Sequence, residues 1–197
     1  MSKSFTFSDG LSRKGYHHGN LREALIEAAR FLVTEKGPQG FTLIEAARLA
    51  DVSPAAPYRH FKDREALVAE VSRLGAQAFE RRMRAAAEGA PSPAARLMAL
   101  GQAYLAFARE DPGLYRALFD TNCGPERPRA VLDMLVGTIA AARPDHPDVL
   151  GAATGIWALA HGVALLSVSG NWPASGPSPE RVLNEGARAL VRATAPF

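Results

Sequence analysis

A dense cluster of hydrogen-bond donors lies between positions 58 and 62 of the sequence. Within about one and a half helical turns it brings together a phenol, a guanidinium, an imidazole and an ammonium group. These groups belong to Tyr58, Arg59, His60 and Lys62. Phosphate oxygens and the edges of guanine bases accept hydrogen bonds from such donors. The spacing therefore predicts a surface that contacts DNA.

The residues just before this cluster predict the short helix that presents it. Ser53 followed by Pro54 is a typical N-cap with a proline in the first turn, so we expect a helix to begin at Ser53. Ala55 and Ala56 keep its first turn small, and their methyl groups can meet thymine methyls in a major groove. Pro57 lacks the N–H that a helix needs and displaces the preceding residue from helical angles, so an irregular start is also predicted.

Two more helices are expected to position this one. Residues 42–50 predict a second short helix, and only a brief turn separates it from Ser53. Two short helices joined by so brief a turn bury little surface between them, so they need a third helix as backing. Apolar residues at helical spacing place that helix over 21–36, with Asn20 as its cap. Residues 20–66 are therefore predicted to form a three-helix DNA-binding head.

This stretch resembles the DNA-binding domain of the TetR family of bacterial transcriptional repressors. The matching features are the opening at Thr42, the turn from Ala50 to Ser53, and the run from Tyr58 to Leu67. The resemblance implies that phosphates are contacted by Thr42, Tyr58, His60 and Lys62, and that the bases are faced by Ala55, Ala56 and Arg59. With Ser53, the candidate DNA-contacting set is Thr42, Ser53, Ala55, Ala56, Tyr58, Arg59, His60 and Lys62.

The chain departs from that family's pattern at three positions. Asp51 stands where the family usually has a turn glycine, and Asp adopts the left-handed backbone more readily than most residues do. Ala46 stands where an isoleucine is usual, which thins the core of the head. The third departure is Pro57, inside the expected recognition helix.

The charges of the chain are unevenly distributed. Residues 1–62 hold nine Lys and Arg against six Asp and Glu, whereas the remaining residues hold fourteen of each. The whole net charge of +3 therefore falls in the first third of the chain. Such segregation is what contact with a phosphate backbone requires, and it leaves a neutral body that need not touch DNA.

Cysteine usage and the start of the chain indicate a cytoplasmic protein. Cys123 is the single cysteine, so no intramolecular disulfide framework is possible, and we interpret it as a passive loop residue. Residues 1–19 lack the apolar run of a secretion signal. They are basic and without periodicity, which indicates either a mobile arm that reaches a minor groove or a solvated tail with no role.

The rest of the chain, residues 67–197, predicts further helices and no strands. A capping residue followed by proline recurs at four helix starts: Ser53-Pro54, Ser92-Pro93, Asp111-Pro112 and Ser178-Pro179. Other helices are expected to begin at Asp63, near Val131 and at Asp148. The predicted fold is all-α, with a helical body behind the head for ligand binding and dimerisation.

An uncharged run from 149 to 170 has two interpretations. Its length suffices to span a membrane core of about 30 Å. However, it contains Thr154, His161, two serines and four glycines, so we favour a helix buried on all sides in a dimeric bundle and predict no membrane span. Trp157 with His161-Gly162 resembles the WHG-type ligand domain found behind some TetR heads. That resemblance implies a body that binds an effector and forms a homodimer.

Aromatic residues at helical spacing in the body form either plain core or the wall of a cavity. Polar tips on several of them, together with His161, would give a mostly apolar cavity its few orienting groups. The candidate ligand-binding residues are Phe79, Met83, Tyr104, Phe107, Tyr115, Phe119, Trp157 and His161. Their chemistry suits a small apolar or aromatic effector better than a multiply charged one.

No cofactor or metal site is predicted. The adjacent histidines at 17 and 18, with His60, lack the spacing that converges on one ion, and no cysteine pair assists them. Residues 151–155 are glycine-rich but follow no strand, so they indicate helix packing and not a nucleotide loop.

The sequence thus predicts a cytoplasmic homodimeric transcriptional regulator of TetR type, a repressor that binds a palindromic operator and is released by a small molecule. One alternative is a small-molecule-binding enzyme, although no Ser/His/Asp order, metal spacing or paired carboxylates favour it. Another is a helical interaction protein that has kept a head of this shape. Turnover of a ligand, or equal binding to random DNA, would favour these alternatives.

Overall fold

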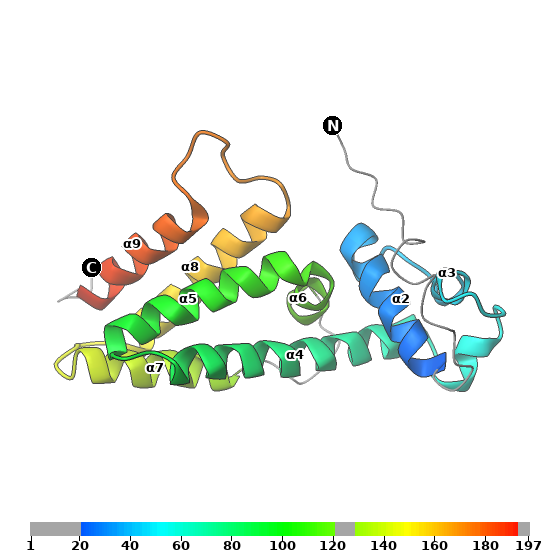
Figure 1. Cartoon of the computed structure of the whole chain (residues 1–197), viewed down its shortest axis with the longest axis horizontal. Coiled ribbons are helices and arrows are strands. Elements are labelled where there is room, and N and C mark those ends of the chain that lie inside the picture. Colours follow the sequence, from blue (N-terminus) through cyan, green and yellow to red (C-terminus); the bar gives the residue numbers. More distant parts are fainter. Residues whose placement is uncertain (1–20, 121–128, 193–197) are drawn as a thin grey trace.

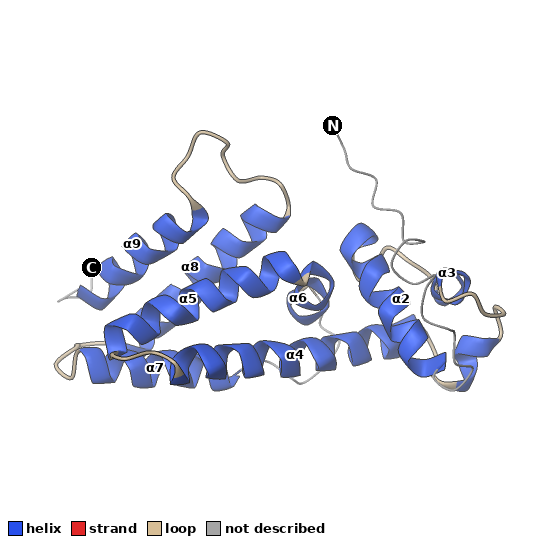
Figure 2. Cartoon of the chain, viewed as in Figure 1, coloured by secondary structure: helices blue, strands red, loops and turns tan. Residues whose placement is uncertain are grey.

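The computed structural model describes residues 21–120 and 129–192, and it shows only helices and loops in these ranges (Figure 1, Figure 2). The prediction of an all-α fold is confirmed. The expected basic arm over 1–19, the cap at Asn20 and Cys123 lie outside the described residues.

Three short elements form a head at one end of the molecule (Figure 1). They are α2 (Leu21–Lys36), α3 (Leu43–Leu49) and a one-turn 3-10 helix, η1 (Ala56–Arg59). α2 has the bounds that its apolar periodicity predicts, and it turns Leu25 and Val33 fully into the core. It is therefore the backing helix that the two shorter elements need.

The long helix α4 (Arg64–Glu88) starts in the head and runs along the body (Figure 1). It is capped as predicted by Asp63, whose carboxylate accepts a hydrogen bond from the Ala66 amide at 2.7 Å. Leu67 is buried near its start, and Met83 is buried near its far end. α4 thus belongs to both parts of the molecule.

In the part of the chain that the structure describes, five further helices form the body. They are α5 (Pro93–Glu110), α6 (Pro112–Phe119), α7 (Arg129–Ala142), α8 (Val149–Val168) and α9 (Pro179–Arg192). Three of the predicted caps with a following proline are confirmed, because side chains of Ser92, Asp111 and Ser178 accept first-turn amides of α5, α6 and α9.

The fourth predicted cap, at Ser53, is wrong. No helix begins there, and the following element is the single 3-10 turn of η1, whose start has no side-chain cap. The reason is Pro57, which has no N–H to donate to the Ser53 carbonyl as an α-helix requires. The Ala56 amide binds that carbonyl instead, at 3.0 Å, and closes a tighter turn. The irregular start that Pro57 predicts is confirmed.

α8 is the uncharged run for which the sequence allows either a membrane span or a helix buried in a dimeric bundle. Among the described helices it is the one long and apolar enough to cross a membrane, with a mean hydropathy of 1.7. It packs against α5, α7 and α9. Leu150, Leu165 and Leu166 remain exposed, so burial on all sides is not reached within a single chain.

Candidate functional site

The turn between α3 and η1 has the backbone that the sequence predicts for it. Asp51 has a φ of +55° and is the one non-glycine residue with positive φ among those described. After it the chain places Pro57 and Phe61 in the core of the head. Because these two residues face inward, the intervening side chains of Tyr58, Arg59 and His60 face solvent.

The eight candidate DNA-contacting residues lie on the outer side of the head. All of them are exposed except Ala56, which is half-buried. Tyr58 is 57% exposed despite its large ring, and the Lys62 side chain is 83% exposed. The ammonium of Lys62 lies 3.7 Å from the Asp63 carboxylate, which is a long, weak ion pair at a surface. The arrangement leaves the side-chain donors of Tyr58, Arg59, His60 and Lys62 available to another molecule.

Thr42 has a structural role that the sequence did not assign. Its hydroxyl accepts a hydrogen bond from the Glu45 amide at 3.2 Å, while the Glu45 carboxylate accepts one from the Thr42 amide at 2.8 Å. This reciprocal capping box starts α3. Lys36, 2.6 Å from Glu45, together with the bonds from Thr42, lowers the pKa of that carboxyl to about 2. The negative charge beside Thr42 is therefore compensated by Lys36.

A charged bridge fixes the position of α2 against α4. Glu70 on α4 lies 2.7 Å from Arg73 and 2.8 Å from Arg22 of α2. Hydrogen bonds from Arg73, and then from Arg22, lower the pKa of Glu70 to about 2, although partial burial acts in the opposite direction. The Arg22 guanidinium also lies 5.6 Å from the centre of the Phe61 ring. α2 is thus held on α4.

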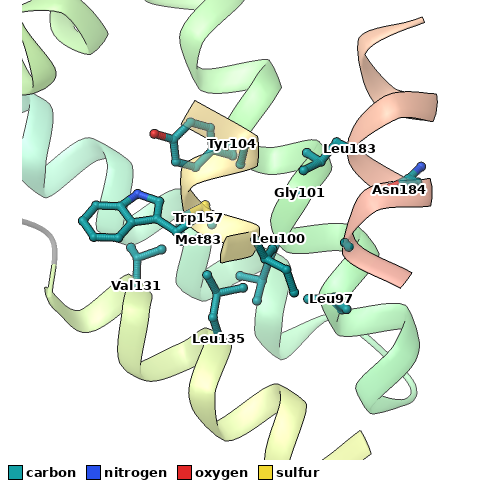
Figure 3. Close-up of a pocket in the computed structure, with 13 residues that line it drawn as sticks. Met83, Leu97, Leu100, Gly101, Tyr104, Val131, Leu135, Trp157, Leu183 and Asn184 are labelled. Atoms are coloured by element: carbon teal, nitrogen blue, oxygen red, sulfur yellow. The ribbon is translucent and has the colours of Figure 1, made fainter. Parts of the chain in front are cut away.

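In the body, a narrow apolar cavity opens between α4, α5, α7, α8 and α9 (Figure 3). The volume open to the centre of a water-sized sphere is about 20 Å³. The cavity therefore has room for about one water molecule. The lining residues are Met83, Leu97, Leu100, Gly101, Tyr104, Val131, Leu135, Ile156, Trp157, Ala160, Leu183, Asn184 and Ala187. Among the residues that the structure describes, no charged side chain lines the cavity, so it suits an apolar occupant.

Next to the cavity the aromatic residues of four helices form one cluster. Phe79 packs edge-on against Tyr104 and Phe119, with ring centres 5.2 Å and 5.6 Å apart. The hydroxyls of Tyr104 and Tyr115 approach Nδ1 of His161 at 3.0 Å and 3.1 Å. Tyr104 therefore belongs to both the cluster and the cavity.

Burial sets the protonation states in this cluster. It raises the pKa of Tyr104 and of Tyr115, so both hydroxyls keep their protons. It lowers the pKa of His161, against the opposing charge of Asp120, so the imidazole is neutral near pH 7. In the neutral ring, an unprotonated Nδ1 that faces two hydroxyls accepts a hydrogen bond from them. The indole N–H of Trp157 is buried beside the Tyr104 hydroxyl but makes no hydrogen bond of good geometry.

The short helix α6 connects this cluster to the head. Its cap, Asp111, binds Arg30 of α2, and its Gly113 packs directly on the α2 backbone. Arg116 donates a hydrogen bond to the Thr34 carbonyl, near the end of α2, at 2.9 Å. On its other side α6 carries Tyr115, which reaches His161. One helix thus contacts both the aromatic cluster and α2.

The eight candidate ligand-binding residues converge in space but divide into two groups. Met83, Tyr104 and Trp157 line the cavity. The other five, Phe79, Phe107, Tyr115, Phe119 and His161, belong to the adjoining cluster. The aliphatic wall of the cavity was not singled out from the sequence, because its leucines and valines have the periodicity of ordinary core. The contacts of α6 with α2 were also missed, because they join residues about eighty positions apart.

Two family models match the chain. The model described as "Bacterial regulatory proteins, tetR family" matches residues 25–71, which span α2, α3, η1 and the start of α4. The model described as "Tetracyclin repressor-like, C-terminal domain" matches residues 97–190, which span most of the body. A search of curated proteins gives no match.

Solved structures share the fold over nearly the whole chain. A protein of unknown function from Rhodococcus sp. RHA1 is 29% identical, with a TM-score of 0.73, and the match covers 91% of this chain and 97% of that one. A regulatory protein in the tetR family from Rhodococcus RHA1 is 20% identical, with a TM-score of 0.69 and coverage of 87% and 95%.

AibR, solved in complex with isovaleryl coenzyme A and operator DNA, is 18% identical, with a TM-score of 0.64 and coverage of 89% and 98%. At this identity the likeness concerns the fold alone. The two family matches and the shared fold agree with the arrangement of a helix-turn-helix head on a helical body. The chain therefore belongs to the TetR family of transcriptional regulators.

Proposed function

We propose that this regulator is a cytoplasmic homodimeric repressor. It binds a palindromic operator through the head, residues 20–66, and a small apolar or aromatic effector that enters the body, residues 67–197, releases it. The division follows α4, which passes from one part to the other, and the spans of the two family matches.

The observation that carries this proposal is the double contact of α6. Tyr115 on α6 lies 3.1 Å from His161 beside the cavity, while Asp111 at its start lies 2.7 Å from Arg30 of the head. A displacement of α6 at the aromatic cluster is therefore passed on to its contacts with α2. A regulator whose affinity for DNA responds to a ligand needs such a shared element.

The narrowness of the cavity supports an effector that acts by separating helices. A space that holds about one water molecule cannot admit a larger ligand unless α5, α8 or α9 moves. The effector then favours the expanded arrangement, which holds the head in a position that fits DNA less well. A coupling free energy of about 1–3 kcal/mol changes operator affinity by roughly five- to 150-fold.

In the head, we assign phosphate contacts to Thr42, Tyr58, His60 and Lys62, and base contacts to Ala55, Ala56 and Arg59, with Ser53 at the edge of the same surface. Their exposure supports the assignment. Because η1 is a single turn, few side chains can reach base edges, and Arg59 carries most of the direct base recognition.

The homodimer is assigned to α8 and α9. One head covers too few base pairs for operator selectivity, so two heads must lie about 34 Å, one DNA turn, or a small multiple of it apart. Exposed Leu150, Leu165 and Leu166 give α8 an apolar outer face that a second copy would bury.

The apolar lining of the cavity supports the proposed class of effector. The AibR complex indicates that a protein of this fold can hold both a small molecule and operator DNA. Trp157 offers its buried N–H, and the Tyr104–Tyr115–His161 group offers its hydroxyls, as orienting contacts for an oxygen of the effector. We assign no catalysis to these groups.

The proposal is tested by selecting bound duplexes from a random DNA pool, screening compounds for release, and repeating both assays with Trp157→Ala and His161→Ala. We expect both variants to bind the selected operator and to lose part of the response to the inducer. If both keep the wild-type affinity and the wild-type response, the effector site lies elsewhere.

A further inference from the structure

A second, wider groove lies at the end of the body farthest from the head. It is formed by the start of α5, the end of α7 and the end of α9, at the left of Figure 1. Ala94, Leu97, Met98 and Val191 give it an apolar floor. The centre of a water-sized sphere has about 320 Å³ there, against about 20 Å³ in the inner cavity, so the groove is open without any movement of the helices.

Two arginines form the charged wall of this groove. Arg188 and Arg192 lie one turn apart on α9, and both are exposed. Within 21–120 and 129–192, no acidic residue lines the groove. Neither has an acidic partner among the described residues. In contrast, Arg181 on the same helix is paired with Glu185 at 2.8 Å, and Arg143 nearby is paired with Asp145 at 3.3 Å.

The start of α5 adds to this positive potential. Ala94 and Ala95 belong to its first turn and line the groove, so the positive end of the dipole of an 18-residue helix faces the same space as the two arginines. Two guanidinium groups without a carboxylate and a helix start together favour an anion. The apolar floor between them favours a hydrocarbon part attached to it.

The groove and the inner cavity are adjacent. Leu97 lines both of them. On α9, Asn184 lines the inner cavity (Figure 3). Ala187 lines it too, and the next residue, Arg188, lines the groove. Between Tyr104 at the inner end and Ala94 at the outer end, α5 rises about 15 Å, or ten residues at ~1.5 Å each. A ligand of that length reaches from the aromatic cluster to the arginines.

We propose that the effector is an amphipathic anion, whose hydrocarbon chain fills the inner cavity and whose carboxylate or phosphate group binds Arg188 and Arg192. This inference rests on the proposed function, because it takes the inner cavity to be the effector site. The cavity lining alone indicates an apolar effector, and the groove indicates that this effector also has a charged end. An uncharged apolar compound would use only half of the site.

The test uses the full chain with Trp172→Phe, so that Trp157 in the inner cavity is the remaining tryptophan and its fluorescence reports on that cavity. Decanoate, decyl phosphate and decanol are titrated separately. Each is repeated in the double variant Arg188→Gln and Arg192→Gln, and in the control Arg181→Gln, which changes a paired arginine outside the groove on the same helix.

We expect decanoate or decyl phosphate to bind about tenfold more tightly than decanol, since a charged hydrogen bond is stronger than a neutral one. The double variant should lose this advantage and bind decanol as before, whereas Arg181→Gln should keep it. The tighter of the two anions then identifies the head group as a carboxylate or a phosphate.

Equal affinity for all three compounds, or anion affinities that the double variant leaves unchanged, would overturn the inference and leave the inner cavity as an apolar effector site. If no compound changes the fluorescence of Trp157, the inference is overturned, whereas the proposed function is decided separately by the inducer response of Trp157→Ala and His161→Ala.

Discussion

Arg30 of α2 and Asp111 at the start of α6 form a two-point ion pair across the boundary between head and body. Nη2 of Arg30 lies 2.7 Å from Oδ2 of Asp111, and Nε lies 2.9 Å from Oδ1. Asp111 also accepts the Leu114 amide as the cap of α6. The carboxylate that starts α6 is therefore the one that binds the head, and the position of α6 depends on the position of α2.

The contact between α6 and α2 leaves no room for a side chain at Gly113. A Cβ there would collide with the Arg30 carbonyl and lie 2.7 Å from Oγ1 of Thr34. We expect Gly113→Ala to lower the free energy of unfolding by about 1–3 kcal/mol. Gly137→Ala on α7, where a Cβ meets nothing within 4 Å, is the control and should be neutral or stabilising. Thermal unfolding compares the two, and equal midpoints would contradict the tight packing.

Asp111→Asn should weaken the coupling between head and cavity while keeping the cap of α6, because Asn also caps helices well. Binding equilibria are reciprocal, so operator DNA must change the cavity if an effector changes DNA binding. In the Trp172→Phe background we expect the selected operator to alter the acrylamide quenching of Trp157, and Asp111→Asn to reduce that change. If the operator changes the quenching of Trp157 equally in Asp111→Asn and in the parent protein, the Arg30–Asp111 pair takes no part in the coupling.

His161 should make the stability of the protein depend on pH. Burial lowers its folded pKa below the ordinary 6.5, so the unfolded chain binds the proton more readily. The contribution of neutral His161 to the free energy of unfolding is then fully present above pH 6.5. It is lost as the pH decreases through the folded pKa of His161. Between about pH 7.5 and 5.5, the unfolding temperature of wild type should fall more than that of His161→Gln. Glu45 and Glu70, with pKa values of about 2, titrate below this window. Parallel curves for both proteins would contradict the assignment.

Leu165→Asp should separate the proposed dimer. The residue is 42% exposed on the outer face of α8, so the change costs little in the single chain but places a charge in the proposed interface. Light scattering at micromolar concentration should give a dimer for wild type and a monomer for the variant, with weaker operator binding. A monomeric wild type that binds its operator normally would refute this interface.

The helices could be predicted from the sequence mainly because their starts are local. Ser92, Asp111 and Asp148 each cap a helix through a bond to an amide three residues ahead, so neighbouring residues decide the boundary. The same rule fails at Ser53, since Pro57 four residues later removes the N–H that the helix needs. A local pattern is thus reliable only where the next turn can form.

The site could be predicted only in part. Its aromatic members are distinctive, and Tyr104, Tyr115 and His161 do meet. The aliphatic wall of the cavity, the Arg30–Asp111 pair and the groove at Arg188 depend on how distant helices pack. Periodicity shows which face of a helix is apolar, but not which helix covers it or where a gap remains.

The exposed head should read a specific DNA sequence, which fluorescence anisotropy measures with a duplex selected from a random pool. At one fixed salt concentration, wild type should bind that duplex about a thousandfold more tightly than a scrambled one. Arg59→Ala should relax preference at one base position by about 1–3 kcal/mol, and Lys62→Ala should weaken binding to both duplexes and lower the salt slope by about one unit. Equal affinity of wild type for the selected and scrambled duplexes would show that the head does not read DNA sequence.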